Sequence, residues 1–347
     1  MMLETMRPGI YTSYTVSAYG AGEGERGLGI VSASQIPQLS VQKITSQGQA
    51  QELFGPLDGA APMTRMIIAA LQNGVGKLYA VSPATEDESG YEAALNQLLE
   101  VPEVYAVCTD REDQELETFL KTKLDAMEAE GRERIAVLGS SDWEQAEQKA
   151  VRMNHKRICV AYPAAASSQG AGNLSPVLLG SMICREHRPY SNLNGELAEG
   201  DFILSQQLSR EQQEQLMQVG ICLLEPASDA VMLVRGMTTH TKNESGLNDR
   251  TYRNISSVLI LDQVVPGLRQ VLQQLLTSSD NSTASLDGIQ SMTASRLEDF
   301  KQQGLISDYG VPNVYLKEDD RTVCVVEVNF TVRQGLNQIY LTAQIHV

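Results

Sequence analysis

The sequence predicts an α/β domain with a mainly parallel sheet covered by helices, followed by a smaller α+β module at the C-terminal end. Two observations predict this order. Short apolar strands alternate with helical stretches up to about residue 240, a spacing typical of βαβ units. A long amphipathic helix then precedes segments in which apolar and polar residues alternate. We therefore expect an N-terminal arm and linker at 1–24, an α/β domain at 25–240 and a C-terminal module at 241–347.

The α/β domain opens with an apolar strand near 28–32 and helices near 46–54 and 62–73, the second of which ends at Asn73 and Gly74. Strands and helices then alternate. The expected strands lie at 77–81, 104–109, 134–138 and 158–162, with helices near 89–101, 112–130 and 142–153 between them. Helices near 174–187 and 209–219 and strands at 221–224 and 230–237 complete the domain. The loop 163–173 is small and polar, so we expect it to be mobile.

The C-terminal module begins with a long helix near 251–276. Its apolar residues follow a helical stripe, namely Ile255, Val258, Leu261, Val265, Leu268, Leu272 and Leu275. Pro266 lies inside this helix and is expected to kink or divide it, because proline lacks an N–H and crowds the carbonyl of Asp262. A second helix near 289–303 ends at Gly304, and strands follow.

Both ends of the chain have patterns suited to strand pairing. In the strand from Cys324, the side chains of Val326, Val328, Phe330 and Val332 share one face. A final strand repeats the alternation at Ile339, Leu341, Ala343, Ile345 and Val347. Gln334 and Gly335 permit a hairpin between them, but an extended crossover to another chain fits equally well. An open sheet edge recruits strands from other chains unless something covers it.

The N-terminal arm carries a short extended segment, Arg7-Pro8-Gly9-Ile10-Tyr11. Gly20, Gly22 and Gly24 loosen the joint between this arm and the body.

Composition narrows the classes of partner. The 347 residues carry a net charge of −16, which argues against nucleic acid because binding phosphates needs clustered Lys and Arg. No apolar run approaches the roughly 20 residues of a membrane helix, so we expect no membrane insertion. The N-terminus has neither the basic nor the apolar region of a signal peptide, so we expect the chain to be made in the cytoplasm.

No residue pattern predicts a metal, a cofactor or a catalytic residue. The five cysteines have no CxxC spacing, and the four histidines have no metal-ligand spacing. Gly20-x-Gly22-x-Gly24 precedes the first strand, whereas a dinucleotide fingerprint follows one. Gly139-Ser140-Ser141-Asp142 lacks the second glycine of a nucleophile elbow, so Ser141 or Asp142 is better explained as a helix N-cap. Asp110, Glu112 and Asp113 precede a helix in the same way.

One group of segments, taken in order along the chain, matches a pattern found in a known family. Val234-Arg235-Gly236-Met237-Thr238-Thr239-His240 is followed by Asp249-Arg250-Thr251-Tyr252-Arg253-Asn254-Ile255 and by Leu259-Ile260-Leu261-Asp262. With the arm and the terminal strands, this order resembles the tail sheath protein of contractile phage tails and phage-tail-like bacteriocins. The matching positions are Arg235, Thr238, Thr239, Asp249 and Asp262.

The resemblance implies a structural subunit without a cofactor, not an enzyme. Such subunits polymerise around a tail tube and contract, which drives the tube through a target cell envelope. The implied partners are further copies of the chain, the tube protein, and baseplate and tail terminator proteins. The implied setting is the bacterial host cytoplasm during assembly, and then a phage virion tail or a released tail-like particle.

In the family, the arm and the C-terminal strands of neighbouring subunits join one sheet. Carried over to this chain, the pairing residues are Pro8, Gly9, Ile10, Tyr11, Val326, Val328, Phe330, Ile339, Leu341 and Ile345, with Gly20, Gly22 and Gly24 as the linker. Two other functions stay open from the sequence. One is a small-molecule α/β enzyme with an oligomerising C-terminal module, and the other is a non-contractile self-assembling scaffold.

Overall fold

The computed structural model describes residues 26–168, 170, 172–185, 192–277, 285–320 and 323–333. The N-terminal arm, the linker glycines and the final strand lie outside these residues. The predictions for Pro8 to Tyr11, for Gly20, Gly22 and Gly24, and for Ile339, Leu341 and Ile345 therefore concern parts of the chain that the structure does not describe.

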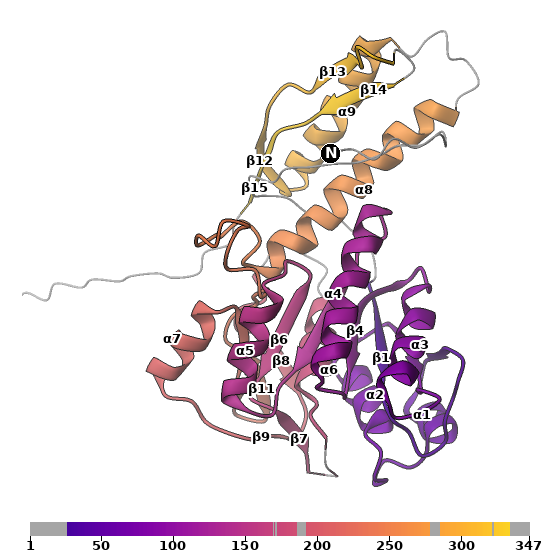
Figure 1. The fold of residues 1–347 in the computed structure, drawn as a ribbon, viewed down its shortest axis with the longest axis vertical. Helices are drawn as coiled ribbons and strands as arrows, with labels where there is room; N and C mark the ends of the chain where they lie inside the picture. The colour runs from indigo at the N-terminus through magenta and orange to yellow at the C-terminus, as the bar shows by residue number, and fades with distance from the viewer. Residues whose placement is uncertain are drawn as a thin grey trace, which may run out of the picture.

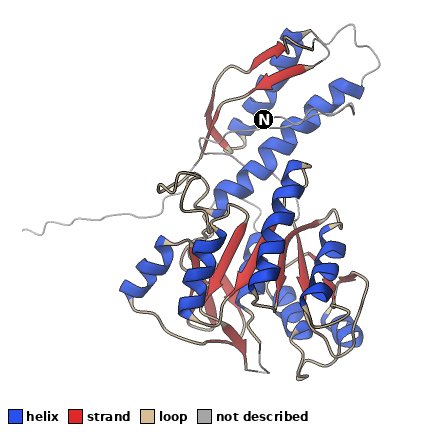
Figure 2. Ribbon diagram, viewed as in Figure 1, coloured by secondary structure: helices blue, strands red, loops and turns tan. Residues whose placement is uncertain are grey.

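The body of the protein is a nine-stranded sheet with helices on both faces (Figures 1 and 2). The strand order is β2-β3-β1-β4-β5-β6-β10-β11-β8, and the six strands from β3 to β10 are parallel. Their bounds are β1 Gly27–Val31, β3 Lys77–Val81, β4 Val104–Thr109, β5 Ile135–Gly139, β6 Ile158–Tyr162 and β10 Ile221–Ala227. β1, β5 and β6 are buried at every position, because helices cover both of their faces.

Two buried cores lie on the two faces of this sheet. One face is covered by α1 Gln47–Phe54, α2 Met63–Gln72 and α6 Ser175–Arg185. The other is covered by α3 Glu88–Leu99, α4 Gln114–Ala129, α5 Trp143–Met153 and α7 Arg210–Gln218. Asp113 and Asp142 cap α4 and α5 by accepting a backbone hydrogen bond three residues on, so the capping interpretation of these two residues is confirmed.

The α/β fold class with a mainly parallel sheet is confirmed, but several short strands were not predicted. These are β2 Gln42–Ile44, β7 Ala165–Ser167, β8 Leu197–Glu199 and β9 Phe202–Leu204. β7 lies inside the loop expected at 163–173 and pairs with β9, so part of that segment is sheet. The predicted strand 230–237 ends earlier, since β11 spans Ala230–Leu233.

The helix α8, Ile255–Thr277, connects the body to the C-terminal module (Figure 1). Its first turns bury Ile255, Val258 and Leu259 in the core of the body. Further along, Ile260, Val264 and Leu268 belong to a separate core with α9. Pro266 does not divide the helix, which continues for eleven residues beyond it. We attribute this continuity to the buried residues on either side of the proline.

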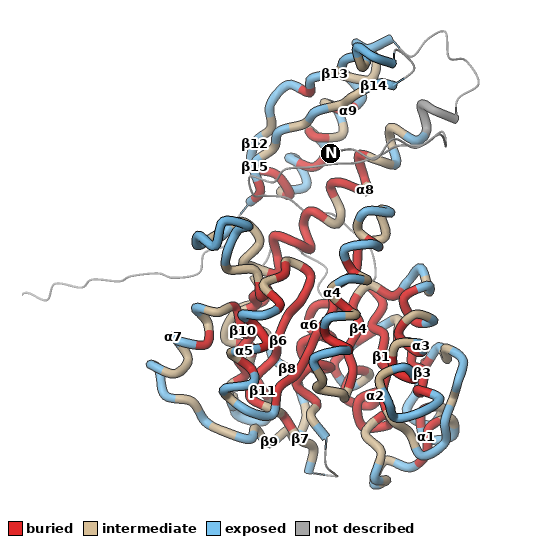
Figure 3. Tube along the Cα trace, viewed as in Figure 1, coloured by how far each residue is buried: buried red, intermediate tan, exposed pale blue. Residues whose placement is uncertain are grey.

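The expectation about apolar runs was wrong for this helix. By length and composition, Ile255–Gln273 could cross a membrane, and it is the one such stretch among the described residues. More than half of it is buried inside the protein (Figure 3). Its apolar side chains are therefore taken up by packing against the body and α9.

The C-terminal module consists of the second half of α8, α9 Leu286–Gln302 and four short strands. The strands are β12 Ile306–Tyr309, β13 Asn313–Leu316, β14 Cys324–Glu327 and β15 Phe330–Val332. The single strand predicted from Cys324 is thus divided into β14 and β15. The predicted alternation is retained, because Val326, Val328, Phe330 and Val332 are more buried than Glu327, Asn329, Thr331 and Arg333.

Candidate inter-subunit site

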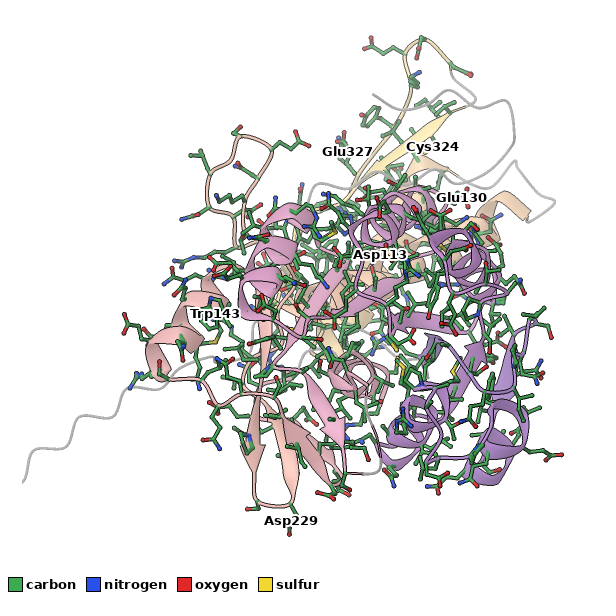
Figure 4. The ribbon with its side chains drawn as sticks, turned by 60° about the horizontal axis from the view of Figure 1, so that its bottom comes forward. Asp113, Glu130, Trp143, Asp229, Cys324 and Glu327 are labelled. Atoms are coloured by element: carbon green, nitrogen blue, oxygen red, sulfur yellow. The ribbon has the colours of Figure 1, made fainter. Side chains whose placement is uncertain are left out.

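The C-terminal ribbon, defined here as residues 306–332, is a bent pair of antiparallel segments. β12 pairs with β15, and β13 pairs with β14. Between these two ladders, the Gly310 N–H donates to the Asn329 carbonyl at 2.8 Å, which keeps the two segments together at the bend. Figure 4 shows Cys324 and Glu327 on β14, clear of the α/β body.

One face of the ribbon packs on α9. Val332 and Ile306 are buried beside Leu297 and Phe300, and Val328 and Phe330 pack partly against the same core. The Tyr309 hydroxyl donates to Glu298 at 2.9 Å. The side chains of Val328 and Phe330 therefore stabilise their own subunit, and what the ribbon offers to another chain is its backbone edge.

The outer part of the ribbon exposes apolar side chains and unpaired edges. Val311 is 81% exposed, and Tyr315, Leu316 and Val323 are also exposed. Among the described residues, β13 and β14 pair only with each other. A two-stranded sheet is marginally stable by itself, and its open edges are templates for further strands.

The hydrogen-bond pattern identifies which backbone groups face outward. The Lys317 N–H donates to the Val323 carbonyl at 2.9 Å. Antiparallel pairs alternate between bonded and non-bonded, so the pair Leu316–Cys324 and the pair Val314–Val326 are non-bonded. The N–H groups of Cys324 and Val326 therefore point to the free edge of β14, and those of Val314 and Leu316 to the free edge of β13.

The large sheet, in contrast, has protected edges. Its two edge strands, β2 and β8, have three residues each. The Asn73 side chain accepts from the Glu199 N–H at 2.9 Å and donates to the Glu199 carbonyl at 3.1 Å. The backbone groups of Glu199, in edge strand β8, are therefore already hydrogen-bonded. Short and occupied edges discourage association through this sheet. Among the described residues, the ribbon is thus the better candidate for strand pairing.

The residues that carry the resemblance lie elsewhere, at the junction between the body and α8. Asp262 accepts two hydrogen bonds from the Arg157 guanidinium, at 2.6 and 2.7 Å, and one from the Tyr105 hydroxyl at 2.6 Å. The side chains of Arg157 and Asp262 are 1% and 2% exposed. Burial alone would lower the pKa of Arg157, but Asp262 and Glu128 outweigh it and raise that pKa. These bonds fix α8 to Tyr105 of β4 and to Arg157, the residue before β6.

The threonine pair and Asp249 anchor the segment that leads into α8. Thr239 donates to the His155 carbonyl at 3.1 Å and accepts from the His155 N–H at 3.0 Å. Thr238 donates to the Tyr252 carbonyl at 2.7 Å. Asp249 pairs with His240 at 3.0 Å, and burial, which raises its pKa, is outweighed by hydrogen bonds that lower the pKa to about 2.

A second ion pair holds α8 further along. Arg269 donates to Glu133 at 3.0 Å and to the Gly131 carbonyl at 3.2 Å, both just beyond the end of α4. Positions 262 and 269 lie two turns apart on α8. The sequence motif includes Asp262, but the hydrogen-bond partners of Asp262 could not be predicted from it, because Arg157 lies 105 positions earlier.

Acid is expected to weaken this junction. Burial alone would raise the pKa of Glu128, but Arg157 and Lys156 outweigh it and lower the pKa to about 2. A carboxyl whose folded pKa lies below its unfolded value of about 4.3 stabilises the protein above that value, and this contribution is lost as the pH falls toward 2. We expect urea denaturation midpoints to fall between about pH 5 and pH 2, and Glu128→Gln to flatten this dependence. An unchanged profile in the variant would contradict the assignment.

Two observations on the described residues concern metal and ligand binding. No group of three or more His, Cys, Asp or Glu among them is placed to hold a metal ion. Ligands of open α/β sheets bind outside the carboxyl ends of the strands. At that end, the hollow beside α7 has a volume of 320 Å³ and is lined by Gln206, Gln207, Leu208, Gln213, Leu224, Glu225 and Pro226. Its one carboxylate, Glu225, is bonded to Gln213.

Comparison with known proteins finds similar solved structures but no similar family model or curated sequence. No protein-family model matches the sequence, and no curated protein matches it either. Among solved structures, a chain of the anti-feeding prophage baseplate is 18% identical with a TM-score of 0.74, over 99% of this chain and 100% of that one. The contracted helical sheath of the anti-feeding prophage is 17% identical with a TM-score of 0.71, over 98% and 99%.

A third similar structure is the contracted PVC sheath complex of an extracellular contractile injection system. It is 14% identical with a TM-score of 0.71, over 100% of this chain and 99% of that one. The chain therefore has the fold of these contractile sheath proteins, and the resemblance read from the sequence is confirmed at the level of the fold.

Proposed function

We propose that this chain is a tail sheath subunit, which polymerises around a tail tube and contracts to drive the tube through a target cell envelope. The observation that carries the proposal is the extent of the structural match. The similarity to a contracted sheath spans 98% of this chain and 99% of the other, so it includes the C-terminal module as well as the common α/β body. Fold alone does not confer function, and the open ribbon supplies the second argument.

The ribbon is the acceptor for strands from neighbouring copies. An extended arm of 20 residues reaches roughly 65 Å, enough to cross to an adjacent subunit. In this arrangement Pro8, Gly9, Ile10 and Tyr11 of one copy, and the strand carrying Ile339, Leu341 and Ile345, extend the ladder of another copy beside Val326, with Gly20, Gly22 and Gly24 as the joint. Backbone ladders survive rotation of the bodies that they connect.

Contraction then requires no cofactor and no catalysis. The sheath would pass from an extended lattice to one in which more surface is buried between subunits, which is a change between two packings and not a reaction. The further partners under this proposal are the tube protein, the baseplate and a tail terminator. Assembly takes place in the host cytoplasm, and the product is a virion tail or a released tail-like particle.

The two alternatives have less support. A small-molecule enzyme needs a site, and the hollow beside α7 presents amides and one bonded carboxylate. A non-contractile scaffold would use the same open ribbon. The two functions are distinguished by whether the assembled subunits change from one lattice to another, because only a contractile sheath does so.

Electron microscopy of overexpressed protein tests the proposal. We expect rings, tubes or sheaths in negative stain, and no assembly from a matched variant that lacks residues 336–347 but retains its helix content by circular dichroism. A monomer or compact dimer at high concentration would overturn the assembly proposal. Tubes of one fixed length and diameter under all conditions would favour the non-contractile scaffold.

A further inference from the structure

The loop from Thr241 to Asp249, defined here as the junction loop, contains the longest exposed stretch of the described chain. Residues 242–248 are all exposed, and Leu247 among them is 66% exposed. In Figure 1 the loop projects sideways from the body beside the start of α8. A single exposed leucine is common on protein surfaces, so what sets this loop apart is how firmly it is held.

Hydrogen bonds within the junction loop fix its shape although it is exposed. The Asn243 N–H donates to the Leu247 carbonyl at 2.9 Å. The side-chain oxygen of Asn243 accepts from the N–H groups of Ser245 and Leu247, each at 3.0 Å. At the base of the loop, the Asp249 N–H donates to the Thr241 carbonyl at 2.8 Å. The loop is therefore closed by its own bonds at both its tip and its base.

Asn154 ties the base of the junction loop to the body. Its side-chain oxygen accepts from the N–H groups of Thr241 and Lys242, at 2.9 and 3.0 Å, and its side-chain nitrogen donates to the Lys242 carbonyl at 2.9 Å. Asn154 ends α5 in the left-handed conformation, with φ of 36°. A loop that is already ordered avoids the entropy cost that a flexible loop pays on binding. The junction loop is thus preorganised to present its tip to a partner.

The tip offers hydrogen-bond acceptors beside one apolar side chain. Among the described residues, no group donates a hydrogen bond to the carbonyls of Glu244, Ser245 and Gly246. Leu247 follows these three carbonyls directly. A surface that matches this tip needs apolar side chains and N–H donors within one small hollow.

The hollow beside α7 has both. Its volume is 320 Å³, and its apolar lining consists of Leu208, Leu224 and Pro226. Gln206 and Gln207 also line it. The side-chain oxygen of Gln206 accepts from the Tyr162 hydroxyl at 3.1 Å, so the amide N–H groups of Gln206 are left to donate. The hollow therefore complements the tip of the junction loop in its hydrogen-bonding groups and in its apolar surface.

The junction loop and the hollow lie at opposite ends of the parallel sheet. The Thr239 N–H, two residues before the loop, donates to the carbonyl of Ile158, the first residue of β6. At the other end of β6, Leu223 pairs with Tyr162, and Leu224 of the hollow is the next residue. The rest of the hollow follows β9, at the lower end of the body in Figure 1. A loop fixed at one end of the body is therefore placed to meet the hollow of another copy.

We propose that the junction loop of one copy binds in the hollow beside α7 of a second copy. Leu247 packs against Leu208 and Pro226, and the carbonyls of the tip accept from the amides of Gln206 and Gln207. The proposal rests on the self-assembly proposed above but uses surfaces separate from the ribbon. Because the two partners lie at opposite ends of one subunit, the contact is heterologous, and it propagates into rings or helices and does not stop at a dimer.

Disulfide cross-linking tests this contact in the assembled protein. The background is C324S, because Cys324 is exposed and the other four cysteines are buried. Mild oxidation of L247C/Q207C should give a ladder of dimers, trimers and larger species on a non-reducing gel, since each copy carries both partners. The matched control is L247C/E52C, in which the second cysteine replaces an exposed glutamate on α1, and it should give no ladder.

Two further variants measure how much the contact contributes to assembly. L247D and N154G should each assemble only at concentrations at least about tenfold higher than the parent. N154G removes the three side-chain bonds to the loop, and glycine retains the left-handed conformation at the end of α5. L39D, which changes a leucine that is 56% exposed elsewhere on the body, should assemble like the parent.

The results that would overturn the proposal also separate it from the sheath assignment. Absence of a ladder from assembled L247C/Q207C, or an equal ladder from L247C/E52C, would refute the contact. Normal assembly of L247D would do the same, and in each case tubes from the parent would leave the sheath proposal intact. A parent that stays monomeric at high concentration would overturn both.

Discussion

Replacing Asp262 by alanine is expected to destabilise the protein by about 3 to 5 kcal/mol, the cost of breaking a buried ion pair by removing one partner. Arg157 would remain 1% exposed with Glu128 as its single carboxylate, and Tyr105 would lose the acceptor of its hydroxyl. The free energy of unfolding from urea titration measures the effect at neutral pH.

Two controls separate this effect from other causes. Arg210→Ala removes an ion pair with Glu214 in which the arginine side chain is 92% exposed, so its cost should stay below about 1 kcal/mol. The double variant R157M/D262L removes both charges and should lose much less than D262A, because no uncompensated charge remains buried. A loss below about 1 kcal/mol in D262A would show that the junction does not depend on this pair.

The junction also explains why the two parts of the protein move together in our proposal. α8 contributes to the core of the body through Ile255 and Val258 and to the outer core through Val264 and Leu268. The ion pairs of Asp262 with Arg157 and of Arg269 with Glu133 hold residues 262–269 of α8 against the body. Under the proposed contraction, a rotation of the body would be transmitted to the ribbon along α8.

The body could be predicted from the sequence because its signals are local. β5 and β6 are short apolar runs, and α4 and α5 begin at Asp113 and Asp142, whose side chains cap them. These signals need only neighbouring residues. β7 was missed because Ala165–Ser167 has no apolar alternation, and its pairing with β9 is a tertiary effect.

The junction and half of the ribbon could not be predicted for two different reasons. Arg157 follows His155 and Lys156 in a polar run, and nothing local shows that it is buried or that Asp262 is its partner. The strands β12 and β13 are separated by Gly310, Val311 and Pro312, and the glycine and the proline interrupt a strand pattern and favour a turn. The two ladders and the backbone bond between Gly310 and Asn329 join the two strands into one ribbon.

A second large effect is expected in the ribbon, and it distinguishes which free edge, that of β13 or that of β14, accepts a strand from a neighbouring copy. Val326→Pro removes an N–H that points to the free edge of β14 and leaves the ladder with β13 intact, because Val314 and Val326 form a non-bonded pair. We expect this variant to fold, with native circular dichroism, and to form no tubes in negative stain. Its loss of assembly would follow from the missing donor for a neighbour's strand.

Val314→Pro is the matched control, since it removes the corresponding outward N–H from the opposite edge. If the neighbour's strand joins β14, as the pairing assigned to Val326 implies, V314P should still assemble. The reverse result, with assembly lost only in V314P, would move the acceptor edge to β13. Normal tubes from both variants would show that no strand is added to this ribbon, and the apolar side chains at its outer end, such as Val311, would then have to associate by side-chain packing alone.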